Sequence, residues 1–140
     1  MSTNASQIYF INNSMLAMAR GIAYTVADLA PGTAHELFSS SSLIIWSGAS
    51  DRTIYGDARV NWAFRAWHDA MHLKQGLGFT VEAELELARI QASQCTSDLM
   101  AELVYCEIAG QVEYFAQTGQ FVADQVAFTL NYMRARGMMQ

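Results

Sequence analysis

Apolar residues recur at intervals of three and four along most of the chain, which is the spacing of one buried helix face. This pattern predicts five or six helices, over about residues 14–30, 33–46, 57–74, 80–95, 98–117 and 121–136. The apolar run at residues 43–46 is short and fits a strand as well as a helix, and strand signals elsewhere are weak. The predicted fold class is therefore all-α, a compact bundle of five or six helices.

Polar residues and helix breakers mark the predicted ends of these helices. Pro31 excludes the helical conformation from the residue before it, so the first helix is expected to stop there. Asp57 and Thr80 stand where N-caps are needed, and Gly119 suits the end of the fifth helix. Because no linker or repeat interrupts the 140 residues, we expect residues 1–140 to form one helical domain.

Composition narrows the classes of partner. The net charge is −5 and no run of Lys or Arg occurs, so binding along a nucleic-acid backbone is not expected. No apolar stretch approaches the about 20 residues that span a bilayer. Only 15% of the residues are charged, which favours a homo-oligomer. Cys95 and Cys106 lie in predicted helices without a secretory signal before them, so buried thiols in a cytoplasmic protein are expected.

Two histidines on the third predicted helix form the strongest chemical signal. His68 and His72 are one turn apart, along the edge of an apolar stripe made of Val60, Phe64, Trp67 and Met71. Such a pair is more often hydrogen-bonded structure than a site. Asp69 beside it, Arg65 one turn before it and His35 on another predicted helix favour a site, because imidazole and carboxylate are common metal ligands.

The order His35, then His68-Asp69, resembles the HD superfamily of metal-dependent phosphohydrolases. In that family one helix gives a His, a later helix gives a His-Asp pair, a distant Asp completes the set, and the bound ions activate water. The resemblance implies an HD-like fold and a divalent metal ion (Mn, Mg, Fe, Co or Zn) held by His35, His68 and Asp69. It also implies a small anionic phosphate-containing substrate, such as a nucleotide. Its phosphate would meet Arg65 and His72 as catalytic residues.

The distal Asp of that family has no clear counterpart here. Asp124 lies in the first turn of the last predicted helix, where the helix dipole explains it. Glu107 is the preferred candidate, since its neighbours one turn away are mainly apolar. A carboxylate on such a face is costly unless it binds a metal or pairs with a cation. Glu107 is therefore predicted both as a metal ligand and as a catalytic residue, with Asp124 as the alternative ligand.

Two other readings of the same residues stay open. One is a carboxylate-bridged helical metal site that uses His68, His72, Glu107 and Glu102. The other is a non-catalytic helical interaction protein, most simply a homo-oligomer that blocks a host partner. The run at residues 107–115 also resembles small proteins of bacteriophage genomes, which implies a virus-encoded enzyme or regulator without naming a reaction.

Two further expectations concern the later helices. Glu82, Glu84 and Glu86 alternate through the fourth helix, so they spread around it, and a solvated face is expected for the set. Gly110 in the middle of a helix costs about 1 kcal/mol relative to Ala. We attribute it to the close approach of another helix, with room for a ligand as the alternative.

Overall fold

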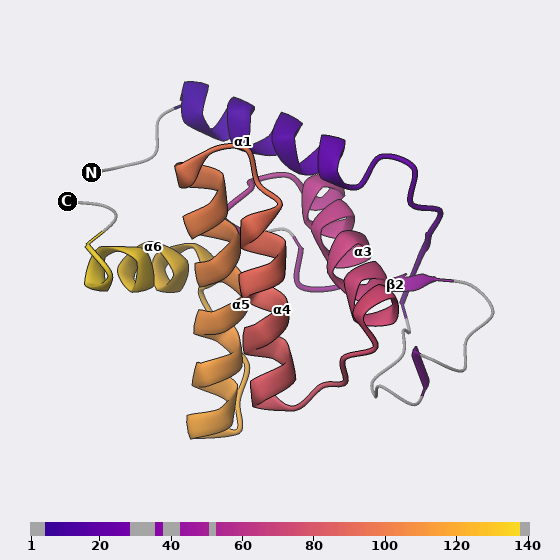
Figure 1. Ribbon diagram of the computed structural model, residues 1–140. Coiled ribbons are helices and arrows are strands. Elements are labelled where there is room, and N and C mark those ends of the chain that lie inside the picture. The colour runs from indigo at the N-terminus through magenta and orange to yellow at the C-terminus, as the bar shows by residue number, and fades with distance from the viewer. Residues whose placement is uncertain (1–4, 29–35, 38–42, 51–52, 138–140) are drawn as a thin grey trace.

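A computed structural model of the chain describes residues 5–28, 36–37, 43–50 and 53–137. Within this part, five helices account for most of the residues and two three-residue strands pair in parallel (Figure 1). The elements are α1 (Ala5–Met18), β1 (Thr25–Ala27), β2 (Ile44–Trp46), α3 (Ala58–Gln75), α4 (Val81–Ser93), α5 (Asp98–Thr118) and α6 (Gln125–Ala135). The predicted all-α class is confirmed.

The three middle helices begin where the sequence predicts them. The side chains of Asp57, Thr80 and Ser97 each accept a hydrogen bond from a backbone N–H in the first turn that follows. Each N-cap satisfies a donor that the helix cannot satisfy itself, which contributes about 1 kcal/mol. At the other end of α5, Gly119 adopts φ 71°, the left-handed conformation of a C-cap.

The first and last helices differ from the prediction. The first helix runs from Ala5 to Met18 instead of over residues 14–30, and the chain turns at Gly21 with φ 89° before it enters β1. The sixth helix starts at Gln125, four residues later than predicted, because Asp124 is its N-cap. Of the second predicted helix, residues 44–46 form β2, and residues 33–35 and 38–42 lie outside the described part.

The core lies where α1, α3, α4 and α5 meet. Figure 1 shows α4 and α5 side by side, α3 next to α4, α1 across their upper ends and α6 across α5. The largest core side chains with 2% exposure or less include Met15, Val60, Leu87 and Leu103, one from each of these helices, and Met133 of α6. Burying each is worth about 1.5–3 kcal/mol, so the amphipathic faces hold the bundle together.

The position of α6 depends on a glycine and one polar contact. A Cβ at Gly110 would lie 3.0 Å from the Phe128 ring and 3.2 Å from the Tyr132 ring, so the expected close approach of another helix is confirmed. Nearby, the buried Thr129 hydroxyl donates to Glu107 Oε2 at 2.9 Å. These contacts place α6 directly against the middle of α5.

Two further findings on the described part concern its helices and its cysteines. None of its helices has the length and apolar character needed to cross a bilayer. Cys95 and Cys106 are both free thiols, and burial raises the pKa of each, to about 11 for Cys95 and about 12 for Cys106. Both therefore stay as inert thiols at neutral pH.

Candidate metal centre

Two imidazoles and one carboxylate converge between α3 and α4. His68 Nε2 lies 3.0 Å from Glu84 Oε2, and His72 Nε2 lies 2.9 Å from Glu84 Oε1. The two Nε2 atoms are 3.2 Å apart. We call His68, His72 and Glu84 the histidine–glutamate cluster. Within the described residues it is the one group of three or more His, Cys, Asp or Glu side chains arranged to hold a metal ion.

The end of α3 fixes the orientation of His72. Gly76 takes φ 66° and ends the helix, and the N–H groups of Gly76 and Leu77 both donate to the His72 carbonyl oxygen. This turn brings the Leu77 carbonyl oxygen to 2.8 Å from His72 Nδ1. Because a carbonyl oxygen only accepts, Nδ1 must carry the proton. The edge of the Phe79 ring packs on the same imidazole.

Gln91 of α4 plays the corresponding part for His68. Its side-chain oxygen lies 2.6 Å from His68 Nδ1, which donates the proton to it. The Gln91 side chain is fully buried, and His68 is its hydrogen-bond partner among the described residues. A metal-binding histidine commonly donates its second ring N–H to an oxygen in this way, which fixes the tautomer and the ring plane. Both histidines of the cluster show that arrangement.

The cluster requires a positive charge at its centre. With both Nδ1 atoms protonated, neutral imidazoles turn two Nε2 lone pairs toward Glu84, whose oxygens also only accept. Burial raises the pKa of Glu84, but the hydrogen bonds and charges of the two imidazoles outweigh it and bring the value to about 2. Burial lowers the pKa of His68, and its contacts with Glu84 more than compensate and raise it. A proton or a metal cation must therefore balance the carboxylate.

The spacing of the donor atoms suits a metal ion. Ligand atoms bound at about 2.0–2.1 Å lie about 2.9 Å apart on an octahedral ion and about 3.3 Å apart on a tetrahedral one. The separation of the two Nε2 atoms, 3.2 Å, falls in this range. His72 Nε2 lies 2.9 Å from one oxygen of Glu84, and His68 Nε2 lies 3.0 Å from the other. Both oxygens of the carboxylate face the imidazoles, so Glu84 could give one or both of them to a divalent cation. Three protein ligands leave at least one position open for water or substrate.

A pocket of about 170 Å³ opens next to the cluster. It lies between α3, α4 and α5, and His68 and Glu84 form part of its wall. Its other polar lining residues include Asn61, Arg65, Glu107 and Gln111, and Phe64 and Ile108 are among the apolar ones. Polar and charged side chains outnumber apolar ones in this lining, so the hollow suits a small polar ligand better than an apolar one.

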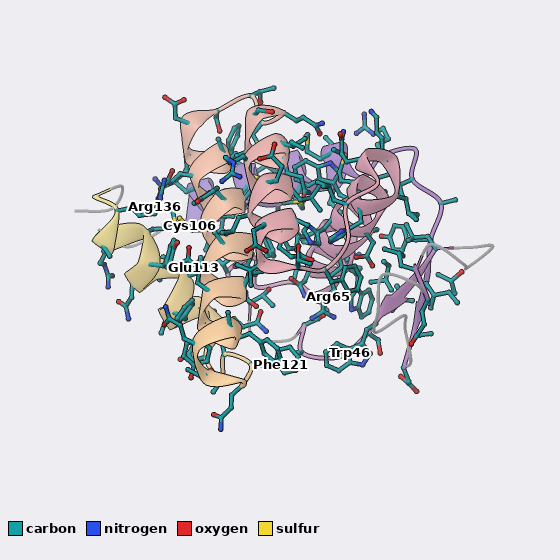
Figure 2. The ribbon with its side chains drawn as sticks, turned by 60° about the horizontal axis from the view of Figure 1, so that its bottom comes forward. Trp46, Arg65, Cys106, Glu113, Phe121 and Arg136 are labelled. Atoms are coloured by element: carbon teal, nitrogen blue, oxygen red, sulfur yellow. The ribbon has the colours of Figure 1, made fainter. Side chains whose placement is uncertain are left out.

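Arg65 lines this pocket and also holds the segment that follows β2. Its guanidinium donates to the backbone carbonyls of Trp46 and Gly48, and it lies 5.2 Å from the centre of the Trp46 ring (Figure 2). Burial lowers the pKa of Arg65, while the charges of Asp69 and Glu107 raise it, and the side chain remains a cation. Its predicted contact with substrate phosphate stays a prediction.

Glu107 forms another part of the pocket wall, from α5. Its Oε1 accepts from Gln111 Nε2 at 3.1 Å and its Oε2 from the Thr129 hydroxyl. Only 3% of the residue is exposed. Burial raises the pKa of Glu107 to about 7, and the Thr129 and Gln111 hydrogen bonds and the charge of Arg65 only partly offset the effect. Glu107 is thus in the predicted apolar setting, outside the histidine–glutamate cluster.

The other predicted site residues lie elsewhere. His35 is outside the described residues. Asp69 is within electrostatic reach of both imidazoles, and burial raises the pKa of its carboxyl, but it does not belong to the cluster. Glu102 pairs with Arg136 and accepts from Cys106. Figure 2 labels these two partners, and both lie where α5 and α6 meet. Asp124 caps α6.

Glu84 and Gln91 were not predicted as site residues. The expectation of a solvated face for Glu82, Glu84 and Glu86 is wrong for Glu84, which points to α3. Helical spacing contains the signal, because Glu84 and Gln91 are two turns apart on the face that also carries the buried Leu87 and Ala88. A carboxylate on that face needs a partner, and the two histidines supply it.

No protein-family model matches the sequence, and neither curated proteins nor solved structures gave a match.

Proposed function

We propose that this chain is a metal-dependent phosphohydrolase that acts on a small phosphate ester. The observation that carries the proposal is the convergence of His68 Nε2, His72 Nε2 and the two Glu84 oxygens, with contacts of 2.9–3.2 Å, beside a pocket. Two histidines and one carboxylate with an open position are the ligand set of catalytic zinc and iron sites. A bound divalent ion would lower the pKa of water and polarise a phosphoryl oxygen.

The chain's own residues would prepare the site in two ways. Leu77 and Gln91 hold the two Nδ1 protons, so both Nε2 lone pairs are presented to the ion without reorganisation. Phe64 and Phe79 pack against the imidazoles of His68 and His72 and limit their movement. Groups fixed before the reaction cost little free energy at the moment of reaction.

We argue the phosphate class from the charge of the site. A divalent ion with one carboxylate and two neutral imidazoles retains one positive charge, and Arg65 adds a second at the pocket. Asp69, within electrostatic reach of both imidazoles and of Arg65, offsets part of this charge, and the positive charge that remains favours an anionic substrate such as a phosphate ester. The pocket of about 170 Å³ accepts the phosphate and a few neighbouring atoms, so a larger group such as a nucleoside would extend outside it.

Metal content of the purified protein tests the first part of the proposal. We expect close to one zinc, manganese, iron or cobalt ion per chain after incubation with the metal and removal of the excess. The His72→Ala and Glu84→Gln variants should lose it. Glu82→Gln is the matched control, since Glu82 is exposed on the same turn of α4 and should leave the metal content unchanged.

Phosphate release tests the second part. The loaded protein should hydrolyse ethyl phosphate, acetyl phosphate or a nucleoside monophosphate, and Glu84→Gln should lower the rate by at least about 10²-fold. Wild-type protein that binds no metal would overturn the proposal and favour a non-catalytic interaction protein with a structural histidine pair. Metal without turnover would leave a binding site and remove the hydrolase.

A further inference from the structure

Glu107 is an ionisable group inside the pocket that the metal-binding proposal leaves without a role. It lies on α5, whereas the metal ligands come from α3 and α4, yet all three helices line the same hollow. The two hydrogen bonds that Glu107 receives come from uncharged donors, Gln111 and Thr129. Among the residues that the structure describes, the carboxyl therefore has no ion-pair partner, and burial favours its protonated form.

The two donors also determine which oxygen faces the pocket. Gln111, which donates to Oε1, lines the pocket itself, whereas Thr129, which donates to Oε2, belongs to α6 and is fully buried. Oε1 is thus the oxygen on the pocket side. A carboxylic acid keeps a hydrogen and free lone pairs even when each oxygen accepts one hydrogen bond, so it can still act as a donor.

We infer that Glu107 is the general acid of the proposed hydrolase, and that it donates a proton from Oε1 to the leaving oxygen of an alkyl phosphate ester. This inference rests on the proposed function. It assigns the substrate class more narrowly, to esters whose leaving group is a basic alkoxide. Such a group needs a proton as the bond to phosphorus breaks, whereas a weakly basic leaving group does not.

The step balances without a further reactant. The oxygen of water forms a bond to phosphorus while the bond from phosphorus to the ester oxygen breaks. The ester oxygen takes the bonding electron pair and the Glu107 proton and leaves as an alcohol. The proton that water loses restores the acid form of Glu107, and inorganic phosphate is released. Net, one water is consumed and no oxidant or reductant is involved.

The charged neighbours of Glu107 are consistent with an acid at neutral pH. Arg65 of α3 favours the carboxylate, and burial outweighs it, so the pKa of Glu107 rises to about 7. His68 of α3 and Glu84 of α4 line the same pocket, and Thr129 from α6 is uncharged. Tyr55 and Cys106 are neutral at this pH, because burial raises the pKa of both. A pKa near the working pH suits a general acid.

A pair of substrates separates general-acid catalysis from a structural role. Acetyl phosphate and ethyl phosphate are similar in size. Acetate can leave without a proton, whereas ethoxide needs a proton as it leaves. In metal-loaded Glu107→Gln we expect kcat/KM for ethyl phosphate to fall by about 10²-fold or more, and that for acetyl phosphate by less than about 10-fold. Glu113→Gln, on the same helix but outside the pocket lining, is the control and should change neither.

A second readout does not depend on activity. The ¹³C signal of the Glu107 side-chain carboxyl should titrate near neutral pH in the metal-free protein, and Glu107→Gln should remove that signal. Equal losses with both substrates, or a Glu107 midpoint below about pH 5, would overturn the inference while the metal site and hydrolysis stand. Wild-type protein without any turnover would overturn the proposed function and, with it, this inference.

Discussion

Glu84 and Glu107 show how two carboxyl groups on adjacent helices acquire opposite properties. Both are withdrawn from water, which disfavours the charged form of a carboxyl. Glu84 meets two imidazoles, whose hydrogen bonds and charges more than compensate, so its pKa falls to about 2. Glu107 meets only an amide and a hydroxyl, so burial prevails and its pKa rises to about 7. The partners of each group, more than its depth, decide its charge at neutral pH.

The raised pKa of Glu107 predicts how stability depends on pH. Its value in the folded protein exceeds that of an unfolded chain, about 4.3, so the folded state holds more protons between these values. The contribution of Glu107 to the free energy of unfolding should therefore be highest below about pH 4.3. It should fall by about 3 kcal/mol by about pH 7. Urea unfolding of the wild type and of Glu107→Gln across this range measures the difference.

Glu107→Gln should remain folded without this decline and be more stable than the wild type at about pH 8, because a neutral amide needs no charge buried. Glu113→Gln serves as control. Glu113 accepts from the Tyr132 hydroxyl and is only partly buried, so the pH profile should keep the wild-type slope. If the free energy of unfolding of Glu107→Gln depends on pH as that of the wild type does, the Glu107 carboxyl ionises as easily in the folded state as in the unfolded one.

Gln91 gives a second prediction at the scale of single residues. Its side chain holds the Nδ1 proton of His68, so Gln91→Leu should lower zinc affinity by about 10- to 100-fold without removing a metal ligand. Competition with a chromophoric chelator measures the dissociation constant. Gln94→Leu, at the exposed end of α4, is the matched control. Equal affinities of Gln91→Leu and wild type would mean that His68 needs no orienting partner.

The ligands of the candidate site lie near the ends of two consecutive helices, so the helix ends position them. The cluster takes its histidines from the last turns of α3 and its carboxylate from the first turns of α4. Five residues, 76–80, join the two helices, and the Gly76 cap and the Thr80 cap at their two ends together determine how the ligands meet. Behind them, α5 packs along α4 and carries Glu107 into the same pocket.

Two glycines with the same conformation test the role of the α3 C-cap. Gly76 and Gly119 end α3 and α5 with φ 66° and 71°, and a Cβ at either would meet no atom within 4 Å. Substitution by Ala at either site should therefore cost a similar free energy of unfolding, about 1 kcal/mol, through backbone strain alone. Chemical denaturation of both variants compares these costs.

Metal affinity should separate the two variants. Gly76→Ala shifts the turn that aims the Leu77 carbonyl at His72, so its zinc affinity should fall by about 10-fold. Gly119→Ala leaves the cluster untouched and should bind zinc as the wild type does. If both variants bind zinc equally well, the α3 cap does not position His72.

For the molecule as a whole, the sequence predicted the parts of the fold that local chemistry determines. Asp57, Thr80 and Gly119 satisfy helix-end groups through neighbours a few residues away, so the boundaries of α3, α4 and α5 could be placed within a few residues. The strand β1 was not predicted, and for residues 43–46, which contain β2, strand and helix stayed equally open, because each strand has three residues and its pairing partner is 19 residues away in the chain. Long-range pairing of this kind overrides a local helical spacing.

Local patterns likewise predicted part of the site and missed the part that depends on contacts between distant residues. His68 and His72 share one helix, so their spacing alone placed them together. Glu84 was not found, because a row of three alternating glutamates resembles a solvated helix until the position of α3 is known. The uncharged partner of Glu107, Thr129, is 22 residues away on α6, so no local pattern showed that the buried carboxyl is satisfied without a cation.

Joining two helices through one ion should stabilise the whole molecule, and this yields the last prediction. A metal that binds the folded chain and not the unfolded one adds about 2.7 kcal/mol to the free energy of unfolding at 100 times its dissociation constant. Zinc should therefore raise the melting temperature of the wild type, and EDTA should reverse the shift. His72→Ala should melt at the same temperature with and without zinc, whereas Glu82→Gln should respond as the wild type does. A zinc-induced shift that persists in His72→Ala would place the ion away from the histidine–glutamate cluster.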